Sequence, residues 1–392
     1  MTVSAVQTLA EQWYERFRAY SADLYPGRYS REFCMYLAEL ALRIRELARR
    51  KQSVIVAHNY LYPEFHEIAD KVGDSLGLSF YVRDTGAPRV DFQAVFFMAS
   101  TAKIIVGDRA RVFVSDTPET LGCSLVFGTD HAWVEQWKRE HPDGIVITYI
   151  NSDVYTKALS DFVTTSRNTD RVMVYVARHF PGRKILFLPD KYLGYVMRAR
   201  AARQGVDPDL IDIYAVEKGE WHASCYVHEK IGRDALTWAV MKYHDLLASG
   251  EAELMIHPEC GCASYCLSEV ESGNIPYGSA YFLSTEQMVE RARRSSARLF
   301  IVATEKGLVY RLRKEVPTKT FIPVSQASVC DYMKANTLEK LLRSLQEDRY
   351  EIVFCDDCCD PRQPYRDETV IHIPRTTAAR ARRAIERMME IV

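Results

Sequence analysis

The sequence predicts an α/β protein made of three similar three-layer α/β/α domains, whose parallel sheets surround a pseudo-threefold axis. Three observations support this prediction. Apolar runs of strand length alternate with helical patterns, polar residues follow equivalent runs, and cysteines recur at nearly even intervals. Alternation of strands and helices is typical of parallel sheets that carry helices on both faces and are joined by right-handed crossovers.

Three apolar runs, SVIVA, GIVIT and AELMI, have the length of buried strands, and each is followed by polar residues two positions apart. The pairs are His58 and Tyr60, Tyr149 and Asn151, and His257 and Glu259. In an extended chain this spacing points both side chains to the same side. Ligands bind open α/β sheets at the carboxyl ends of the strands, so we expect the three pairs to share one site.

A hydroxyl side chain recurs downstream of each pair. Ser75 lies 17 residues after His58, and Ser166 lies 17 residues after Tyr149. In the third copy the dipeptide Ser284-Thr285 follows after a longer loop. A hydroxyl at a helix N-terminus suits a carboxylate or phosphate ligand, although each could equally serve as a helix cap.

Cys123, Cys225 and Cys330 are separated by 102 and 105 residues, and each follows an apolar run: RVFVSD, DIYAVE and TFIPVS. Further strands are expected at AVFFM, KILFL and RLFIVA. A single cysteine is more often a buried apolar thiol, but the threefold repeat predicts that the three meet. Three thiolates are one ligand short of closing a four-iron cluster, which leaves an iron free to bind substrate.

Other polar residues carry weaker signals. His228 follows Cys225 in CYVHEK and is expected to line the same cavity, the alternative being an exposed turn. Lys103 is expected to be solvated, and residues 260–283 to be an inserted loop. Two further cysteine groups suggest a second metal or a redox disulfide only weakly, since neither supplies four ligands. They are Cys260, Cys262 and Cys266, and Cys355, Cys358 and Cys359.

The repeat divides the chain into five parts. We expect an N-terminal helical extension (1–48), three α/β domains (49–125, 126–226 and 227–345), and a C-terminal strand and helix segment that packs on the core (346–392). A chain of this length usually forms more than one domain.

Composition excludes several classes of partner. The net charge is −1 without a long basic run, so there is no electrostatic case for nucleic-acid binding. The N-terminal residues lack the pattern of a secretory signal, and no stretch approaches the roughly 20 apolar residues of a membrane span. We therefore expect a cytoplasmic protein that does not bind membranes, with its 10 cysteines reduced or bound to metal.

The string of motifs resembles the quinolinate synthase family. The matching pieces run in order from about residue 54 to 346: VIVAHNY, GDSL, FMASTAKI, LGCSL, TYINSD, TTSRN, FLPDKYLG, CYVHE, HPEC, STEQM, ATEKGLVYRLRKEVPTKTFIP and CDYMKANTLEKLLRSL. The sequence differs from the family pattern at Ser100, where many members have an acidic residue. The segment between HPEC and STEQM is longer than usual, which leaves Ser279 as the alternative to Ser284-Thr285.

The resemblance implies three similar α/β domains around a pseudo-threefold axis. It also implies an enzyme of de novo NAD biosynthesis that condenses iminoaspartate with dihydroxyacetone phosphate to quinolinate, with a functional link to an iminoaspartate-producing enzyme. A [4Fe-4S] cluster would be held by Cys123, Cys225 and Cys330, its fourth iron acting as a Lewis acid in a dehydration. The implied substrate-binding and catalytic residues are His58, Tyr60, Ser75, Tyr149, Asn151, Ser166, His228, His257, Glu259 and Thr285, with Tyr60, His58, His257 and Glu259 as the catalytic set.

Two other functions are compatible with the residues alone. An aconitase-like [4Fe-4S] hydro-lyase would use the same open iron on one small hydroxy acid, without needing sites for two anions. An iron–sulfur sensor without turnover would not need polar pairs at the strand ends of all three copies. Formation of quinolinate from the two substrates separates these functions.

Overall fold

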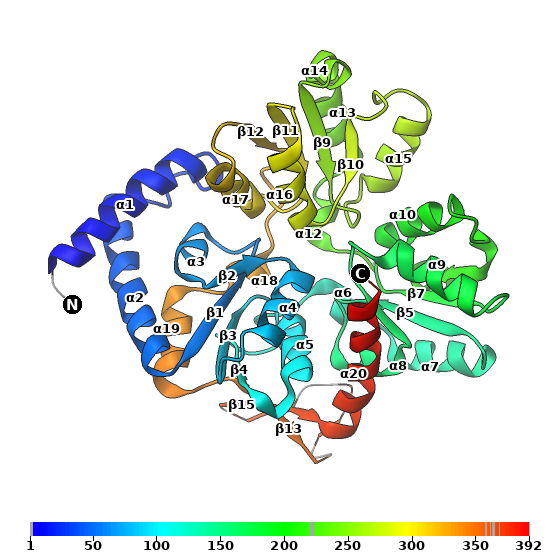
Figure 1. The fold of residues 1–392 in the computed structure, drawn as a ribbon, viewed down its shortest axis with the longest axis horizontal. Coiled ribbons are helices and arrows are strands. Elements are labelled where there is room, and N and C mark those ends of the chain that lie inside the picture. The colour runs from blue at the N-terminus through cyan, green and yellow to red at the C-terminus, as the bar shows by residue number, and fades with distance from the viewer. Residues whose placement is uncertain are drawn as a thin grey trace.

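The computed structural model describes residues 3–219, 223–356, 359–360, 362, 365–367 and 369–391. These residues form three sheets, and in each sheet the strand that comes first in the chain pairs in parallel with both of its neighbours. Helices cover the sheets, and the three resulting lobes meet near the centre of the molecule (Figure 1). The predicted α/β class with parallel sheets is confirmed.

The first sheet has the strand order β14-β15-β13-β4-β3-β1-β2. Its strands are β1 (Ser53–His58), β2 (Lys71–Gly73), β3 (Arg89–Gln93), β4 (Arg111–Phe113), β13 (Glu351–Cys355), β14 (Tyr365–Arg366) and β15 (Val370–Pro374). The second sheet has the order β6-β5-β7-β8 and the third β10-β9-β11-β12. Their strands are β5 (Ile145–Tyr149), β6 (Phe162–Thr164), β7 (Ile185–Leu188), β8 (Ile211–Ile213), β9 (Ala252–Ile256), β10 (Ala280–Phe282), β11 (Leu299–Ala303) and β12 (Thr320–Pro323).

The same four-strand arrangement occurs in each sheet. The orders β2-β1-β3-β4, β6-β5-β7-β8 and β10-β9-β11-β12 place the first strand of each unit second from one edge. These first strands, β1, β5 and β9, are mostly or wholly buried because apolar helices cover both faces. The repeat inferred from the sequence is thus a repeat of topology. The residue boundaries of the five predicted parts stay a prediction.

The helices fall into the same groups. Two helices precede the first sheet in the chain, α1 (Val3–Ser21) and α2 (Arg31–Arg50). The helices that belong to the first sheet are α3 (Pro63–Ile68), α4 (Ser75–Asp84), α5 (Phe96–Val106), η1 (Gly107–Arg109) and α6 (Ser124–Phe127). With the second sheet are α7 (His131–Glu140), α8 (Val154–Leu159), α9 (Thr169–His179), α10 (Lys191–Ala202), η2 (Pro208–Leu210), α11 (Tyr214–Glu217) and α12 (Tyr226–Glu229). The remainder are α13 (Arg233–Lys242), α14 (His244–Ser249), α15 (Ala263–Glu271), α16 (Thr285–Arg294), α17 (Gly307–Glu315), α18 (Asp331–Lys334), α19 (Leu338–Glu347) and α20 (Arg375–Glu390).

The expectation of a strand at AVFFM was wrong. That run leads into α5, and the strand beside β1 is the preceding segment RVDFQ, which forms β3. Its charged residues hid the strand pattern. Arg89 and Asp91 are both buried and form an ion pair at 2.8 Å, so a strand with two charges fits inside the sheet.

The expectation of an inserted loop at residues 260–283 was also wrong. This stretch contains α15 and β10, and β10 pairs in parallel with β9. A strand of three residues has too little periodicity to be recognised in sequence, and it exists because β9 offers it an edge.

The C-terminal segment completes the first sheet and reaches the second lobe. Strand β13 pairs antiparallel with β4, and β15 pairs in parallel with β13. Helix α20 then packs against α5 of the first lobe and against β6 and α8 of the second (Figure 1). The side chain of Asn168 donates to the carbonyls of Met388 and Ile391, which fixes the end of α20 on the second lobe.

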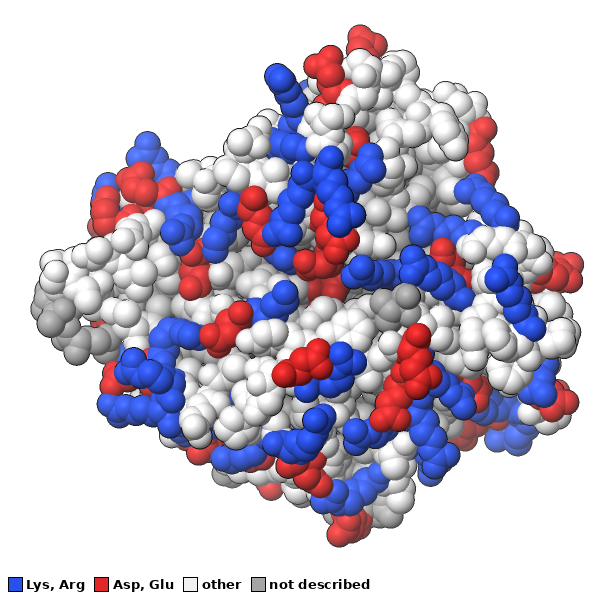
Figure 2. Space-filling model, in the orientation of Figure 1, with Lys and Arg blue, Asp and Glu red and all other residues white. Residues whose placement is uncertain are grey.

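Acidic and basic residues are interspersed over the face of the molecule seen in Figure 2. This agrees with the near-zero net charge of the chain. Within the described ranges, none of the helices combines the length and the apolar character that a membrane crossing requires.

Because α20 bridges two lobes, its buried face should be important for stability. Replacing Ile385, which is fully buried, with alanine should lower the free energy of unfolding by about 2–5 kcal/mol. Urea unfolding measures this loss. The exposed neighbour Arg383→Ala should change stability by less than about 0.5 kcal/mol. An Ile385→Ala protein as stable as Arg383→Ala would show that the bridge contributes nothing.

Candidate active site

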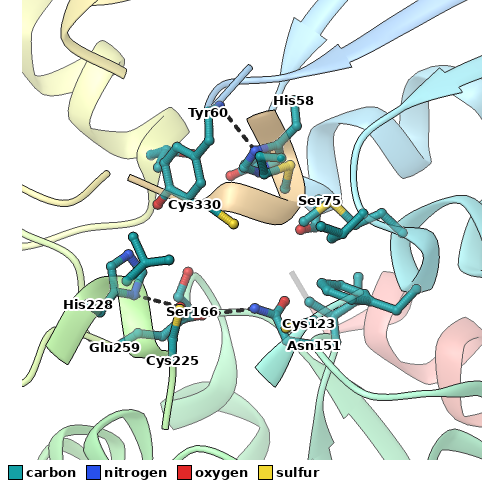
Figure 3. Close-up of a pocket in the computed structure, with 18 of the residues that line it drawn as sticks. His58, Tyr60, Ser75, Cys123, Asn151, Ser166, Cys225, His228, Glu259 and Cys330 are labelled. Carbon is teal, nitrogen blue, oxygen red and sulfur yellow. Dashed lines mark hydrogen bonds and ion pairs between the residues drawn. The ribbon is translucent and has the colours of Figure 1, made fainter. Parts of the chain in front are cut away.

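One buried cavity lies where the three lobes meet, and all the predicted site residues line it (Figure 3). These residues are His58, Tyr60, Ser75, Cys123, Tyr149, Asn151, Ser166, Cys225, His228, His257, Glu259, Thr285 and Cys330. The structure therefore brings together residues spread over most of the chain. Their roles in binding and catalysis stay predictions.

Strand register shows that Thr285 is the third-copy equivalent of Ser75 and Ser166. His58 lies opposite Gly73 and Tyr149 opposite Thr164, in each case two residues before the serine. In the third sheet Ile256 lies opposite Phe282, so His257 aligns with the residue two positions before Thr285. The alternative, Ser279, is absent from the cavity lining and donates instead to the carbonyl of Pro276.

The two strand-end histidines have the same local hydrogen bond. The backbone N–H of Tyr60 donates to His58 Nδ1 at 3.2 Å, and that of Glu259 donates to His257 Nδ1 at 3.4 Å. A neutral imidazole whose Nδ1 accepts a hydrogen bond carries its proton on Nε2. Both rings therefore have an Nε2–H to offer to a ligand, and Ser166 Oγ lies 3.4 Å from Nε2 of His257.

Both imidazoles are neutral at physiological pH. Burial, reinforced by the neighbouring His257, lowers the pKa of His58 to about 3. Burial also lowers the pKa of His257 to about 4, in spite of the opposing charge of Glu259. The two residues can thus act as hydrogen-bond donors to an anion without carrying a charge themselves.

Glu259 is the buried carboxylate of the cavity. His228 Nδ1 lies 2.9 Å from its Oε2, and the side-chain amide of Asn151 donates to Oε1 at 3.4 Å. Burial by itself would raise the pKa of Glu259, but His257, His228 and the hydroxyl of Tyr149 outweigh it and lower that pKa to about 2. The carboxyl group of Glu259 is therefore ionised at physiological pH.

A chain of polar groups connects Tyr60 to this carboxylate. The hydroxyl of Tyr60 lies 2.6 Å from Oγ1 of Thr304, which lies 3.3 Å from Nε2 of His228, and Nδ1 of the same ring faces Glu259. Burial and the charge of Glu259 keep the pKa of Tyr60 well above its ordinary value, so its hydroxyl stays protonated. The chain can carry a proton between two sides of the cavity.

Thr304 was missed by the sequence analysis as a site residue. Register places it at the end of β11, opposite His257, and the equivalent positions at the ends of β3 and β7 are Ala94 and Pro189. Because neither has a hydroxyl, the internal repeat gave no signal.

The first and third lobes are fastened together beside the cavity. The amide of Asn59 donates to Oγ1 of Thr285 at 2.8 Å, and the Arg311 guanidinium donates to Oδ1 of Asn59 at 2.7 Å. Arg311 is itself paired with Glu286 on α16. This buried contact keeps Thr285 in place, and the sequence analysis did not predict it.

The three predicted metal ligands share one local structure. Cys123, Cys225 and Cys330 each form the N-cap of a four-residue helix, respectively α6, α12 and α18, and all three thiols are free. Burial raises the pKa of Cys123 to about 12 and that of Cys330 to about 11, and it raises that of Cys225 too. For Cys225, the negative charges of Glu259 and of the other two thiols add to this rise.

These features fit a metal centre. Thiols that oppose one another's ionisation become a favourable ligand set once a cation is present, because the metal displaces their protons. Helix N–H groups beside each sulfur also favour the thiolate. In the described residues, donor atoms of Cys225, His228 and Glu259 lie within 4.8 Å of one another, so a metal bound here would border the acid–base groups.

The fold and the cavity together define an α/β protein in which three parallel-sheet units share one thiol-bearing site. A family model described as quinolinate synthetase A protein matches residues 42–390. The chain is 40% identical over 354 residues to the quinolinate synthase of Pyrobaculum aerophilum, covering 90% of this chain and 99% of that relative. It is 39% identical to that of Thermus thermophilus, with 90% and 97% covered, and 34% identical to that of Mycobacterium tuberculosis, with 90% and 88% covered.

The chain therefore belongs to the quinolinate synthase family. The resemblance found in the sequence motifs is confirmed.

The neutral histidines predict a pH dependence of stability. Below about pH 6.5 the unfolded chain binds protons on His58 and His257, whereas the folded chain does not until the pH nears 3 to 4. Stability should thus fall as the pH decreases from about 6.5 to 4, with each histidine contributing up to about 1.4 kcal/mol per pH unit. Urea unfolding between pH 5 and 8 under anaerobic conditions measures the slope.

A variant pair assigns that slope to the cavity. In His58→Gln the change of the unfolding free energy with pH should be smaller by up to about 1.4 kcal/mol per pH unit, because one proton-binding group is lost. Replacement of the exposed His244 by glutamine should leave this slope unchanged. Equal slopes in both variants would contradict a neutral, buried His58.

Proposed function

We propose that this chain is a quinolinate synthase that condenses iminoaspartate with dihydroxyacetone phosphate to quinolinate, in de novo NAD biosynthesis. The observation that carries the proposal is the convergence on one cavity of three thiols and a set of acid–base groups, in a member of this family. An enzyme that produces iminoaspartate must supply the first substrate.

The cofactor of the proposal is a [4Fe-4S] cluster held by Cys123, Cys225 and Cys330. Three thiolates leave one iron of such a cluster without a protein ligand. When bound, the cluster supplies a Lewis acid that helps a hydroxyl group to leave in a dehydration.

The side chains around the cavity fit two anionic substrates. Hydroxyls come from all three lobes, at Ser75, Ser166 and Thr285. Nε2–H donors come from His58 and His257, whose neutral state avoids repulsion between the two rings. Such donors, set in place before the ligand arrives, stabilise negative charge in a buried site far better than water does.

Proton transfer is assigned to Tyr60 and Glu259. Tyr60 keeps its proton and can donate it, and the chain through Thr304 and His228 can restore it. In the ligand-free cavity Glu259 is a weak base, because its neighbours lower its pKa to about 2. An anionic substrate placed beside it would raise that pKa and make the carboxylate a better proton acceptor.

The cavity excludes water by burial. His58, His228, His257 and Glu259 are each almost fully covered. The contact of Asn59 with Thr285 holds the first lobe against the third over the site. Exclusion of water protects a reactive imine from hydrolysis during the condensation.

Anaerobic incubation of the cluster-loaded protein with iminoaspartate and dihydroxyacetone phosphate tests the proposal. Quinolinate should form with the wild-type protein. It should be lost, together with about four irons and four sulfides per chain, when Cys225 is replaced by alanine. Cys34→Ala, which removes a buried thiol from α2, should retain both.

Other results would exclude the proposed reaction. A protein that turns over a hydroxy acid alone would indicate the hydro-lyase, and one that binds a cluster but shows no turnover would indicate a sensor. One metal ion per chain without sulfide would indicate a mononuclear site at Cys225, His228 and Glu259 instead.

Replacement of Glu259 by glutamine should lower quinolinate formation by about 10²- to 10⁴-fold while the cluster absorbance is kept, because the change removes a proton acceptor but no thiol. The matched control is Glu253→Gln, a buried glutamate of the same lobe that is paired with Arg291 outside the cavity. Glu253→Gln should retain activity. Near-normal turnover by Glu259→Gln would remove Glu259 from the mechanism.

A further inference from the structure

Lys157 lies on α8, shortly after the strand end that carries Asn151, and its side chain is fully buried. Its ammonium donates to the carbonyl of Ile150 at 2.9 Å and also to the carbonyl of Ser152. These are the two residues on either side of Asn151. One buried cation therefore holds the backbone on both sides of a cavity residue.

A buried ammonium without a carboxylate partner is costly, so its presence needs a reason. In the part of the chain that the structure describes, Lys157 has no ion pair, since the nearby Asp153 is paired with His131 at 2.8 Å. Burial lowers the pKa of Lys157 to about 7, against the opposing charge of Asp153. A hydrogen bond from a charged donor is about twice as strong as a neutral one. In its protonated form Lys157 therefore holds the carbonyls of Ile150 and Ser152 more strongly than a neutral donor would.

The residue held between these carbonyls has a free acceptor. The amide nitrogen of Asn151 donates to Glu259 at 3.4 Å, while its Oδ1 is buried and accepts no hydrogen bond from the described residues. Figure 3 shows the Asn151 side chain at the edge of the cavity and directed towards Glu259. An unpartnered buried oxygen costs free energy unless a ligand donates to it.

The backbone at Asn151 has no regular structure of its own. It follows the end of β5, and the N–H of Ser152 bonds back to the carbonyl of Ile150 at 2.8 Å. The first lobe has a related device, because Lys334 donates to the carbonyl of Tyr60. That lysine, however, is paired with Glu305 at 3.2 Å, whereas Lys157 has no ion pair among the described residues.

We propose that Lys157 is a positioning residue, which fixes the backbone on both sides of Asn151 so that the Asn151 amide is held ready for the substrate. The substrate part of this inference rests on the proposed function. Lys157 itself does not line the cavity and acts through Asn151.

A matched control exists on α5. Lys103, expected from the sequence to be solvated, is buried. It donates to the carbonyl of Ala110 at 3.1 Å and lies 5.1 Å from the ring of Phe354, much as Lys157 lies 5.5 Å from the ring of Phe97. It is a buried lysine in a similar setting that does not line the cavity.

Hydrogen–deuterium exchange of the metal-loaded protein tests the positioning without any assumption about the reaction. In Lys157→Met the amides of Ile150 and Ser152 should exchange about tenfold faster or more, because the loop opens locally. In Lys103→Met they should exchange as in the wild type. Unchanged exchange in Lys157→Met would overturn the proposal. If Lys157→Met does not fold, Lys157→Gln removes the charge and keeps one donor for the same comparison.

Kinetics test whether the effect reaches the substrate through Asn151. Lys157→Met should lower kcat/KM for quinolinate formation by about 10- to 100-fold in the wild-type background, and by less than about threefold in an Asn151→Ala background. Equal losses in both backgrounds would contradict action through Asn151. If the wild type formed no quinolinate, the proposed function would fail, and the exchange comparison would still decide whether Lys157 positions the loop.

Discussion

The buried charge of Glu259 is the constraint on which the packing of the second lobe against the third depends. A carboxylate removed from water costs several kcal/mol unless hydrogen bonds replace its hydration. Among the described residues, no lysine or arginine pairs with it; its partners are imidazole, amide and phenol groups. Tyr149 and Asn151 come from the second lobe, at and just after the end of β5, and His257 directly follows β9 in the third. The second and third lobes must therefore close together for this charge to be stable.

Neutral donors surround the cavity, and cations lie one layer further out. The backbone N–H groups of Tyr60 and Glu259 set the tautomer of the two strand-end histidines, so each presents a proton to a ligand. Arg311, Lys157 and Lys334 hold the loops that carry these groups, through Asn59 or through backbone carbonyls. Such a layered arrangement gives an anionic substrate oriented donors, while the buried charges keep those donors in place.

Much of the fold could be predicted because it depends on local patterns. The runs SVIVA, GIVIT and AELMI became β1, β5 and β9, since short apolar segments between helices can be buried only in a sheet covered on both faces. Prediction failed for β3, where the pairing of Arg89 with Asp91 conceals a buried strand, and for β10, where only a neighbouring edge makes three residues a strand. Nor did any local pattern assign β13 and β15 to the first sheet, because that pairing joins segments far apart in the chain.

The sequence by itself determined the strand-end pairs, the hydroxyls and the three cysteines of the cavity, because an internal repeat places equivalent side chains at equivalent positions of the fold. Only the tertiary structure decided how they interact. Thr304 and Lys157 have no counterpart of the same type in the other copies. Register aligns Thr304 with Ala94 and Pro189, and the eight-residue count from Tyr149 to Lys157 leads from His58 to His66 and from His257 to Tyr265. The protonation states of His58 and Glu259 likewise follow from burial and from partners on other lobes, which exist only once the three sheets have closed around the site.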